Sequence, residues 1–166
     1  MSGFEIERKF LVRKGSDFKS QAFASSRIKQ GYIPAKGATV RVRQRDDKGY
    51  LTIKAPSTDG GLRRYEFEKE ITLDEAGHLF QLCDSNVIDK TRYLVKCGNH
   101  TFEVDEFYGA NEGLVMAEVE LQNENEEFEK PDFIGLEVTG DGRFYNKSLR
   151  KYPFAIWRGT LPEEYR

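Results

Sequence analysis

The feature that most constrains the fold is an alternation of apolar and charged residues with a period of two. It first appears in residues 4–12, where apolar side chains occupy most even positions and Glu5, Glu7 and Lys9 occupy odd positions. Because successive side chains of a strand point to opposite faces, these three charged groups share one face. A strand with such a face belongs to a sheet in which that face meets either water or a polar interior.

The same alternation recurs along the chain and predicts about eight strands. The further segments are residues 27–34, 38–45, 50–55, 62–73, 87–97, 100–107 and 113–121. Asp46–Gly49 supplies the turn residues of a hairpin, so we expect antiparallel pairing. Helices are predicted from near Ser16, from Thr72 to about Cys83, and over residues 146–152. Eight strands are close to the number that closes a small barrel.

Length and composition bound the class of protein. The 166 residues suffice for one core and contain no repeat or long linker, so we expect residues 1–166 to form a single domain. Charged residues make up 33% of the chain but nearly cancel, to a net charge of -2, which argues against nucleic-acid binding. No apolar run approaches the ~20 residues of a membrane span, and acidic residues occupy the place of a signal peptide's apolar stretch. A cytoplasmic protein without membrane contact is expected.

A few other residues receive structural interpretations. Cys83 and Cys97 lack zinc-ligand spacing and are expected to be buried free thiols. Lys147 and Arg150 on the last predicted helix are expected to be solvated or, alternatively, to close the mouth of a barrel.

The charged strand faces allow two interpretations. In an ordinary half-buried sheet they face water, and their cross-strand ion pairs each contribute a few tenths of a kcal/mol. In a closed barrel they line the interior, and the apolar parity faces outward beneath helices. Grouping of the charge signs by strand favours the barrel: Glu5/Glu7 and Glu118/Glu120 are acidic, whereas Arg41/Arg43/Arg45 and Lys90/Arg92 are basic. The alternation by itself leaves both interpretations open.

A charged lumen of this kind supports a narrow range of chemistry. Carboxylates two residues apart present oxygens to a hard divalent cation such as Mg²⁺ or Mn²⁺. Arginine binds phosphate with two parallel hydrogen bonds, and lysine binds it as a point charge. A metal on one wall and cations on the other would hold a polyphosphate and offset the charge that develops in phosphoryl transfer.

An ordered set of motifs spanning about residues 3–121 resembles the CYTH, or triphosphate tunnel metalloenzyme, superfamily. The set consists of Glu5-Ile6-Glu7-Arg8-Lys9 (the ExExK pattern), Val40-Arg41-Val42-Arg43, Leu51-Thr52-Ile53-Lys54, Arg64-Tyr65-Glu66-Phe67-Glu68, Lys90-Thr91-Arg92-Tyr93, Glu103-Val104-Asp105-Glu106-Phe107 and Ala117-Glu118-Val119-Glu120-Leu121. The resemblance, which extends to the compact length of the short bacterial inorganic triphosphatases, implies a mainly β (α+β) fold. This fold is an eight-stranded antiparallel closed β-barrel with a polar charged lumen and flanking helices.

The resemblance also implies roles for individual residues. The implied metal ligands are Glu5, Glu7, Asp105, Glu118 and Glu120, for Mg²⁺ or Mn²⁺. The implied substrate-binding residues are Lys9, Arg41, Arg43, Lys54, Arg92, Glu66 and Glu68, the last two shared between substrate or metal contact and structural pairing. A separate hypothesis makes Lys90 a general base, because neighbouring cations lower its pKa toward neutrality, with Tyr32 hydrogen-bonded to it.

The leading functional hypothesis is metal-dependent hydrolysis of a small-molecule triphosphate, inorganic tripolyphosphate, to diphosphate and phosphate. The same superfamily suggests two alternatives, a class IV-type adenylate cyclase and a thiamine triphosphatase. A non-catalytic polyphosphate-binding module would use the same basic wall. Exposed faces of the barrel also allow a homodimer.

Overall fold

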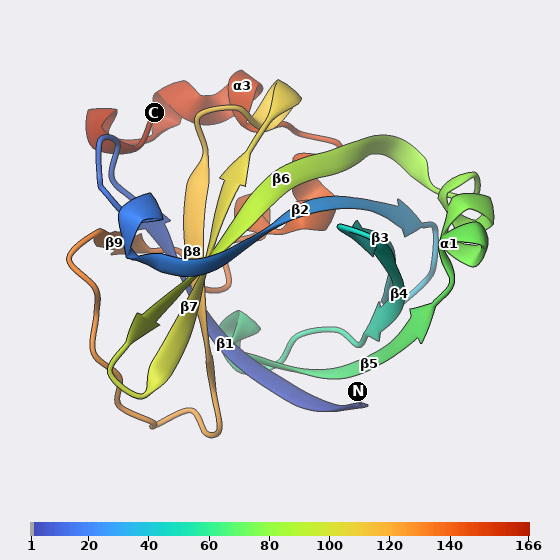
Figure 1. Ribbon diagram of the computed structural model, residues 1–166, viewed down its shortest axis with the longest axis horizontal. Helices are drawn as coiled ribbons and strands as arrows, with labels where there is room; N and C mark the ends of the chain where they lie inside the picture. Colours follow the sequence, from blue (N-terminus) through green and yellow to red (C-terminus); the bar gives the residue numbers. More distant parts are fainter. Residues whose placement is uncertain (1) are drawn as a thin grey trace.

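The computed structural model describes residues 2–166, which form a closed antiparallel β-barrel of eight strands with one additional strand (Figure 1). The strands are β1 (Ser2–Val12), β2 (Ala22–Ile33), β3 (Thr39–Arg45), β4 (Lys48–Lys54), β5 (Arg63–Ile71), β6 (Asp84–Cys97), β7 (His100–Phe107), β8 (Val115–Leu121) and β9 (Ile134–Glu137). They follow the order β5-β4-β3-β2-β6-β7-β8-β1-β9, and pairing of β5 with β1 closes the ring. The predicted eight-stranded barrel is therefore confirmed.

Strand β1 closes the barrel because its two halves pair with different neighbours. Residues 2–6 pair with β5, and residues 6–11 pair with β8. Phe10 and Val12 also pair with β9, which follows β5 along the same edge of β1 because β8 occupies the other edge. The long alternating segment at the start of the sequence is therefore the seam of the barrel.

The charged parity faces inward. The register places Glu5 opposite Arg64, Lys9 opposite Glu118, and Arg92 opposite Asp105. The other parity forms an outer apolar core, which includes Phe10, Phe102, Val104, Ala117 and Val119. The second of the two interpretations is therefore correct, and the inner wall carries charges of both signs.

Connecting segments, and not helices, cover much of this outer core. Phe18 packs against Tyr93 and Phe133, and Phe128 packs against Phe10 and Phe102. Helix α1 (Leu73–Phe80) lies on the far side of the barrel from β9, where it contacts β2, β3 and β4 (Figure 1). The expectation that helices cover the outward-facing apolar residues holds only on the side of the barrel where α1 lies.

The local signals at α1 and at the hairpin are confirmed. Thr72 and Glu75 form the reciprocal capping box that the sequence predicts. Strands β3 and β4 are joined through Asp46 and Asp47, and Asp46 has a φ of 52°, a left-handed conformation that aspartate tolerates in tight turns.

The helix predicted from near Ser16 is wrong. Only a three-residue 3-10 turn, η1 (Lys19–Gln21), forms there, and β2 begins at Ala22. Phe18 is buried in the outer core, and pairing of β2 with β6 begins at the Ala22–Val95 pair. Strand pairing and burial of one aromatic ring thus override the weak helical signal of this segment.

The C-terminal segment closes one end of the barrel. At that end the inward-facing positions Leu11, Ile88 and Met116 are apolar, and they pack with Phe144 and Phe154. The segment contains η4 (Gly142–Phe144), α2 (Asn146–Leu149), α3 (Phe154–Trp157), η5 (Arg158–Thr160) and η6 (Glu163–Tyr165). The helix predicted over residues 146–152 is therefore limited to its first turn, and the lumen is polar only in part of its length.

Arg150 departs from the expectation that it is solvated. It is only 3% exposed, and its guanidinium donates to the backbone and side-chain oxygens of Asp84. Cys83 and Cys97 are free thiols as expected, but both are half-buried and not fully buried. No helix in residues 2–166 has the length and apolar character needed to span a membrane.

Candidate active site

A polar cavity of about 270 Å³ lies inside the barrel. Its lining residues are Glu5, Glu7, Lys9, Tyr32, Thr39, Arg41, Arg43, Arg45, Lys54, Arg64, Glu66, Glu68, Arg92, Glu103, Glu118, Glu120, Tyr145, Asn146, Lys147 and Ser148. Eight of these side chains are Lys or Arg and seven are Glu. The cavity therefore concentrates charge of both signs with almost no net excess of either.

The structure brings together most of the residues predicted for the site. All predicted metal ligands except Asp105, and all predicted substrate-binding residues, line this cavity, as does Tyr32. Asp105 and Lys90 are 2% and 0% exposed and are not among the lining residues. The predicted residues therefore divide into a cavity set and a deeper pair.

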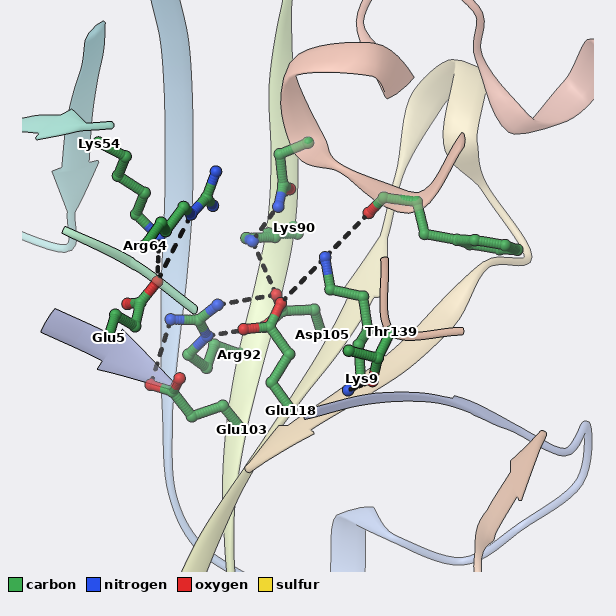
Figure 2. Close-up of polar contacts among 12 residues, drawn as sticks. Glu5, Lys9, Lys54, Arg64, Lys90, Arg92, Glu103, Asp105, Glu118 and Thr139 are labelled. Carbon is green, nitrogen blue, oxygen red and sulfur yellow. Dashed lines mark hydrogen bonds and ion pairs between the residues drawn. The ribbon is translucent and has the colours of Figure 1, made fainter. Parts of the chain in front are cut away.

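One group of lining residues gathers around Glu5. Lys54 Nζ lies 2.9 Å from Glu5 Oε1 and 3.7 Å from a Glu66 oxygen, and Arg64 Nε lies 3.8 Å from Glu5 Oε1 (Figure 2). Burial and a hydrogen bond with Glu66 raise the pKa of Glu5. Cations and carboxylates alternate here, with two carboxyl groups close enough to share a proton.

A second pair of carboxyl groups lies deeper in the cavity. Burial, followed by the charge of Glu118, raises the pKa of Glu7 well above its usual value. Burial opposes ionisation of Glu118 as well, but the charge of Lys9 holds the pKa of Glu118 well below its usual value. Lys9 Nζ lies 3.5 Å from Glu118 and donates to the carbonyl oxygen of Phe144 at 3.2 Å. The opposite directions of these two pKa shifts favour a proton on Glu7 over one on Glu118.

The basic wall contains donors that have no carboxylate partner. Arg41 Nε is buried and has no hydrogen-bond partner in the described chain, although Arg41 Nη2 bonds to Thr52 and lies 3.5 Å from Glu68. Arg43 forms no ion pair with any carboxylate of residues 2–166. Burial, with the charges of Arg41 and Arg92, lowers the pKa of Arg43 to about 9, so it remains a cation at neutral pH. This wall is suited to an anion.

Lys90 and Asp105, which lie behind the lining, form a cluster with the lining residue Arg92, which we call the deep triad (Figure 2). Arg92 donates to both oxygens of Asp105, at 2.7 and 2.9 Å, and Lys90 donates to Asp105 at 2.7 Å and to Asn146 at 3.2 Å. Burial, which outweighs the charge of Asp105, lowers the pKa of Lys90 to about 7. Both oxygens of Asp105 are thus engaged by cations of the protein.

Tyr32 has a different partner from the one expected. Its hydroxyl oxygen accepts a hydrogen bond from Gln30 Nε2 at 2.8 Å, whereas Lys90 Nζ donates to Asp105 and Asn146. No bond between Tyr32 and Lys90 is present in residues 2–166.

Several lining residues were not predicted from the sequence. Arg64 and Glu103 share the inward parity of Glu66 and Asp105, so period-two alternation could have identified them. Tyr145 to Ser148 lie in the C-terminal segment, where no alternation places them in the lumen. Lys147 differs from its neighbours, because one of the two positions expected for it was at the mouth of the barrel.

The donor set of the cavity fits a hard divalent cation. No group of three or more His, Cys, Asp or Glu within residues 2–166 forms a preassembled metal site. Yet in each of two neighbouring carboxyl pairs, Glu5 with Glu66 and Glu7 with Glu118, burial and the partner raise the pKa of one member, and a bound cation would offset the repulsion between the two groups. Carboxylate oxygens are the ligands that such cations prefer.

Comparison with known proteins gives a consistent result. The CYTH domain family model matches residues 3–148 of this chain. An inorganic triphosphatase of Acetivibrio thermocellus is 51% identical over 154 residues, which cover 92% of this chain and 96% of that protein. An inorganic triphosphatase of Nitrosomonas europaea is 35% identical over 150 residues, which cover 87% and 95%. A crystal structure of the inorganic triphosphatase NE1496 matches with a TM-score of 0.62 and 31% identity, covering 88% of this chain and 97% of that one.

Proposed function

This chain belongs to the CYTH domain family, and we propose that it is a triphosphatase that hydrolyses inorganic tripolyphosphate to diphosphate and phosphate inside its barrel. The observation that carries the proposal is the cavity, where Arg41 Nε has no hydrogen-bond partner among residues 2–166 and shares the lining with the carboxyl groups of Glu5, Glu7 and Glu118. Two relatives that align over most of their length are named inorganic triphosphatases. Triphosphatases of this family depend on metal ions in general.

Phosphate oxygens would contact the cations of the lining. We assign this role to Lys9, Arg41, Arg43, Lys54 and Arg92. Arg41 Nε and the guanidinium of Arg43 lead this set, because within residues 2–166 Arg41 Nε has no hydrogen-bond partner and Arg43 has no carboxylate partner. Glu66 and Glu68 lie beside Lys54 and Arg41 respectively, so their role is to orient those cations. Arginine can bind two phosphate oxygens at once, which fixes the position of the chain of phosphates.

The charge of the cavity explains why a divalent cation is needed. Eight cationic and seven acidic side chains nearly cancel, so they cannot neutralise a substrate that carries several negative charges. We assign Glu5, Glu7, Glu118 and Glu120 to Mg²⁺ or Mn²⁺. A bound cation supplies positive charge at the phosphate oxygens and acidifies a water molecule. Asp105, whose oxygens bind Arg92 and Lys90, instead holds those two cations in place.

Hydrolysis also requires a group that accepts a proton from water. The cavity carboxylates are one set of candidate acceptors. Lys90, with a pKa of about 7, is another, although it lies behind the lining and is bonded to the lining residue Asn146. We expect Lys90→Ala to abolish phosphate release while tripolyphosphate binding, measured by calorimetry, is retained. Phosphate release at the normal rate by this variant would exclude Lys90 as the acceptor.

The proposed activity is tested by a product screen. Tripolyphosphate, ATP and thiamine triphosphate are each incubated with the protein and Mg²⁺, Mn²⁺ or no divalent cation, and released phosphate and cyclic AMP are quantified. We expect metal-dependent release from tripolyphosphate, which Glu5→Gln/Glu7→Gln should abolish. Formation of cyclic AMP would indicate a cyclase, and preferential cleavage of thiamine triphosphate would indicate that substrate. Tight tripolyphosphate binding without any release would indicate a binding module.

A further inference from the structure

Gln30 is a completely buried amide that bridges two residues of the cavity lining. It is 0% exposed and is not itself in contact with the cavity. Its Oε1 accepts from Arg43 Nε at 3.2 Å, and its Nε2 donates to the hydroxyl oxygen of Tyr32 at 2.8 Å. Gln30 and Arg43 are direct partners in the register of β2 and β3, and Tyr32 follows Gln30 on the same face of β2.

The chemistry of Arg43 fixes the orientation of this amide. A guanidinium has only donors, so the group that faces Arg43 Nε must be the amide oxygen. The amide nitrogen therefore faces Tyr32, and since it carries only hydrogens, the tyrosine oxygen is the acceptor in that bond. The reverse orientation would set two donors, the amide nitrogen and Arg43 Nε, against each other.

This orientation leaves the hydroxyl hydrogen of Tyr32 available. No other hydrogen bond of this hydroxyl occurs in residues 2–166, and Tyr32 lines the cavity although it is only 3% exposed. We propose that Gln30 is a positioning residue that keeps Tyr32 as a hydrogen-bond donor to a phosphate oxygen of the bound substrate. That the bound substrate is a phosphate compound rests on the proposed function. The direction of the hydrogen bond from Gln30 to Tyr32 does not depend on it.

The surroundings hold Tyr32 in this role. Burial raises the pKa of Tyr32, so the hydroxyl keeps its hydrogen at neutral pH. The guanidinium of Arg150 lies 5.5 Å from the ring centroid of Tyr32 and fixes the ring from the side of the C-terminal segment. Gly31, between the two residues, allows close packing outside the barrel: a Cβ there would lie 2.7 Å from Cys83 Sγ. Strand β2 is therefore held tightly on both faces at this point.

A double-mutant cycle tests the inference. Gln30→Glu keeps the shape of the side chain but replaces the donor toward Tyr32 with an acceptor, so the hydroxyl hydrogen turns away from the cavity. Tyr32→Phe removes that hydrogen. We expect each single variant to lower kcat/KM for tripolyphosphate about tenfold or more, the usual effect of a lost hydrogen bond to a charged group.

The coupling between the two variants is the decisive result. The charge that Gln30→Glu introduces acts in both backgrounds, so it cancels in the comparison. We expect the loss caused by Gln30→Glu to be about tenfold larger in the wild-type background than in the Tyr32→Phe background. Equal losses in the two backgrounds would overturn the inference, because Gln30 would then act on the cavity without Tyr32.

Two controls keep the test interpretable. Gln44→Glu makes the same charge change beside Arg43 in the sequence, on the outward parity of β3, and should leave kcat/KM unchanged. If Gln30→Glu does not fold, as judged by thermal unfolding, the cycle is repeated with Gln30→Met. That variant removes the bond to Tyr32 without reversing it, so we expect a coupling of about threefold between Gln30→Met and Tyr32→Phe. The absence of any coupling between these two substitutions would overturn the inference.

Failure of the proposed function is distinguishable from failure of this inference. If the wild-type protein releases no phosphate from tripolyphosphate, the proposed function fails. The same four proteins are then compared by calorimetric titration with tripolyphosphate and Mg²⁺. The same coupling is expected in Kd, and additive changes in Kd would refute the role of Gln30.

Discussion

Two clusters of charge in the same barrel are organised differently. In the deep triad, both oxygens of Asp105 accept from Arg92, Lys90 donates to one of them, and Lys90 and Asp105 are almost fully buried. In the cavity, Glu7 lies beside Glu118, and burial and the charge of Glu118 raise the pKa of Glu7. Both oxygens of the triad's carboxylate are occupied by protein cations, whereas the cavity pair keeps oxygens that a cation could bind.

The difference separates residues that hold the site from residues that act in it. Removing the partner of a buried charge is strongly destabilising, whereas removing a carboxyl group whose pKa is raised by burial and by a neighbouring carboxylate is not. Loss of Asp105 should therefore act mainly on the stability of the fold, and loss of Glu7 mainly on activity. The sequence motifs predict both as metal ligands, but Glu7 lines the cavity whereas Asp105 contacts Arg92 and Lys90 behind it.

The largest effect is expected at the deep triad. Asp105→Asn leaves the buried cations Lys90 and Arg92 without a full counter-charge and should lower the free energy of unfolding by about 3–5 kcal/mol, measured by urea denaturation. Glu103→Gln is the matched control, since Glu103 also binds Arg92, at 3.2 Å, but its side chain is 42% exposed. It should lose no more than about 1 kcal/mol. Equal losses of unfolding free energy in Asp105→Asn and Glu103→Gln would contradict a special role of the deep triad in stability.

At the cavity pair, activity and stability should separate. Glu7→Gln keeps a donor toward Glu118 but removes a carboxylate proposed to bind metal, so phosphate release should fall about 100-fold, equivalent to about 2.7 kcal/mol. Its free energy of unfolding without metal should be unchanged or slightly higher, because glutamine avoids the cost of burying a carboxyl group whose pKa is raised by burial and by the charge of Glu118. A rate within threefold of the wild type, measured with saturating Mg²⁺ or Mn²⁺, would contradict a metal role for Glu7.

Addition of metal should stabilise the protein through the cavity alone. With Mg²⁺ or Mn²⁺ at about ten times its dissociation constant, the free energy of unfolding should rise by about 1.4 kcal/mol. Thermal unfolding with and without the cation measures this change. Glu5→Gln/Glu7→Gln should abolish it, while Glu137→Gln on the outside of the barrel should preserve it. A metal-induced shift that survives Glu5→Gln/Glu7→Gln would place the cation elsewhere.

The smallest effect is expected where the geometry of the triad recurs on the surface. Arg8 donates to both oxygens of Glu137, at 2.8 and 2.6 Å, much as Arg92 does to Asp105, but both side chains are about one-third exposed. Glu137→Gln should therefore lower the free energy of unfolding by no more than about 1 kcal/mol at neutral pH.

The pH dependence of that contribution has a defined sign. The hydrogen bond from Arg8 lowers the pKa of Glu137 in the folded state, so its stabilisation is present above the usual glutamate pKa. It is lost as the pH falls through the lowered folded value. Urea denaturation of wild type and Glu137→Gln should give different free energies at neutral pH and converging ones in acid. A difference that grows in acid would contradict this assignment.

Much of the site follows from local sequence rules. Period-two alternation placed Glu5, Glu7 and Lys9 on one face, whatever covered that face. Turn residues fixed the hairpin at Asp46, and a capping box fixed the start of α1. These features depend on residues within a few positions of each other, so they could be predicted without knowledge of the rest of the chain.

The sequence by itself therefore determined which side chains share a strand face, but not which face lies inside. That choice was decided by distant segments: Phe18, Phe128 and Phe133 cover the outward apolar parity, and the C-terminal segment closes one end of the lumen. The bonds from Lys9 to Phe144 and from Lys90 to Asn146 span 135 and 56 positions, and no local pattern encodes them. Tertiary packing alone made Asp105 a partner of cations, because burial strengthens the interaction between opposite charges. Packing also joined Gln30 to Arg43 and Tyr32, because a buried amide must satisfy its oxygen and its nitrogen within the protein.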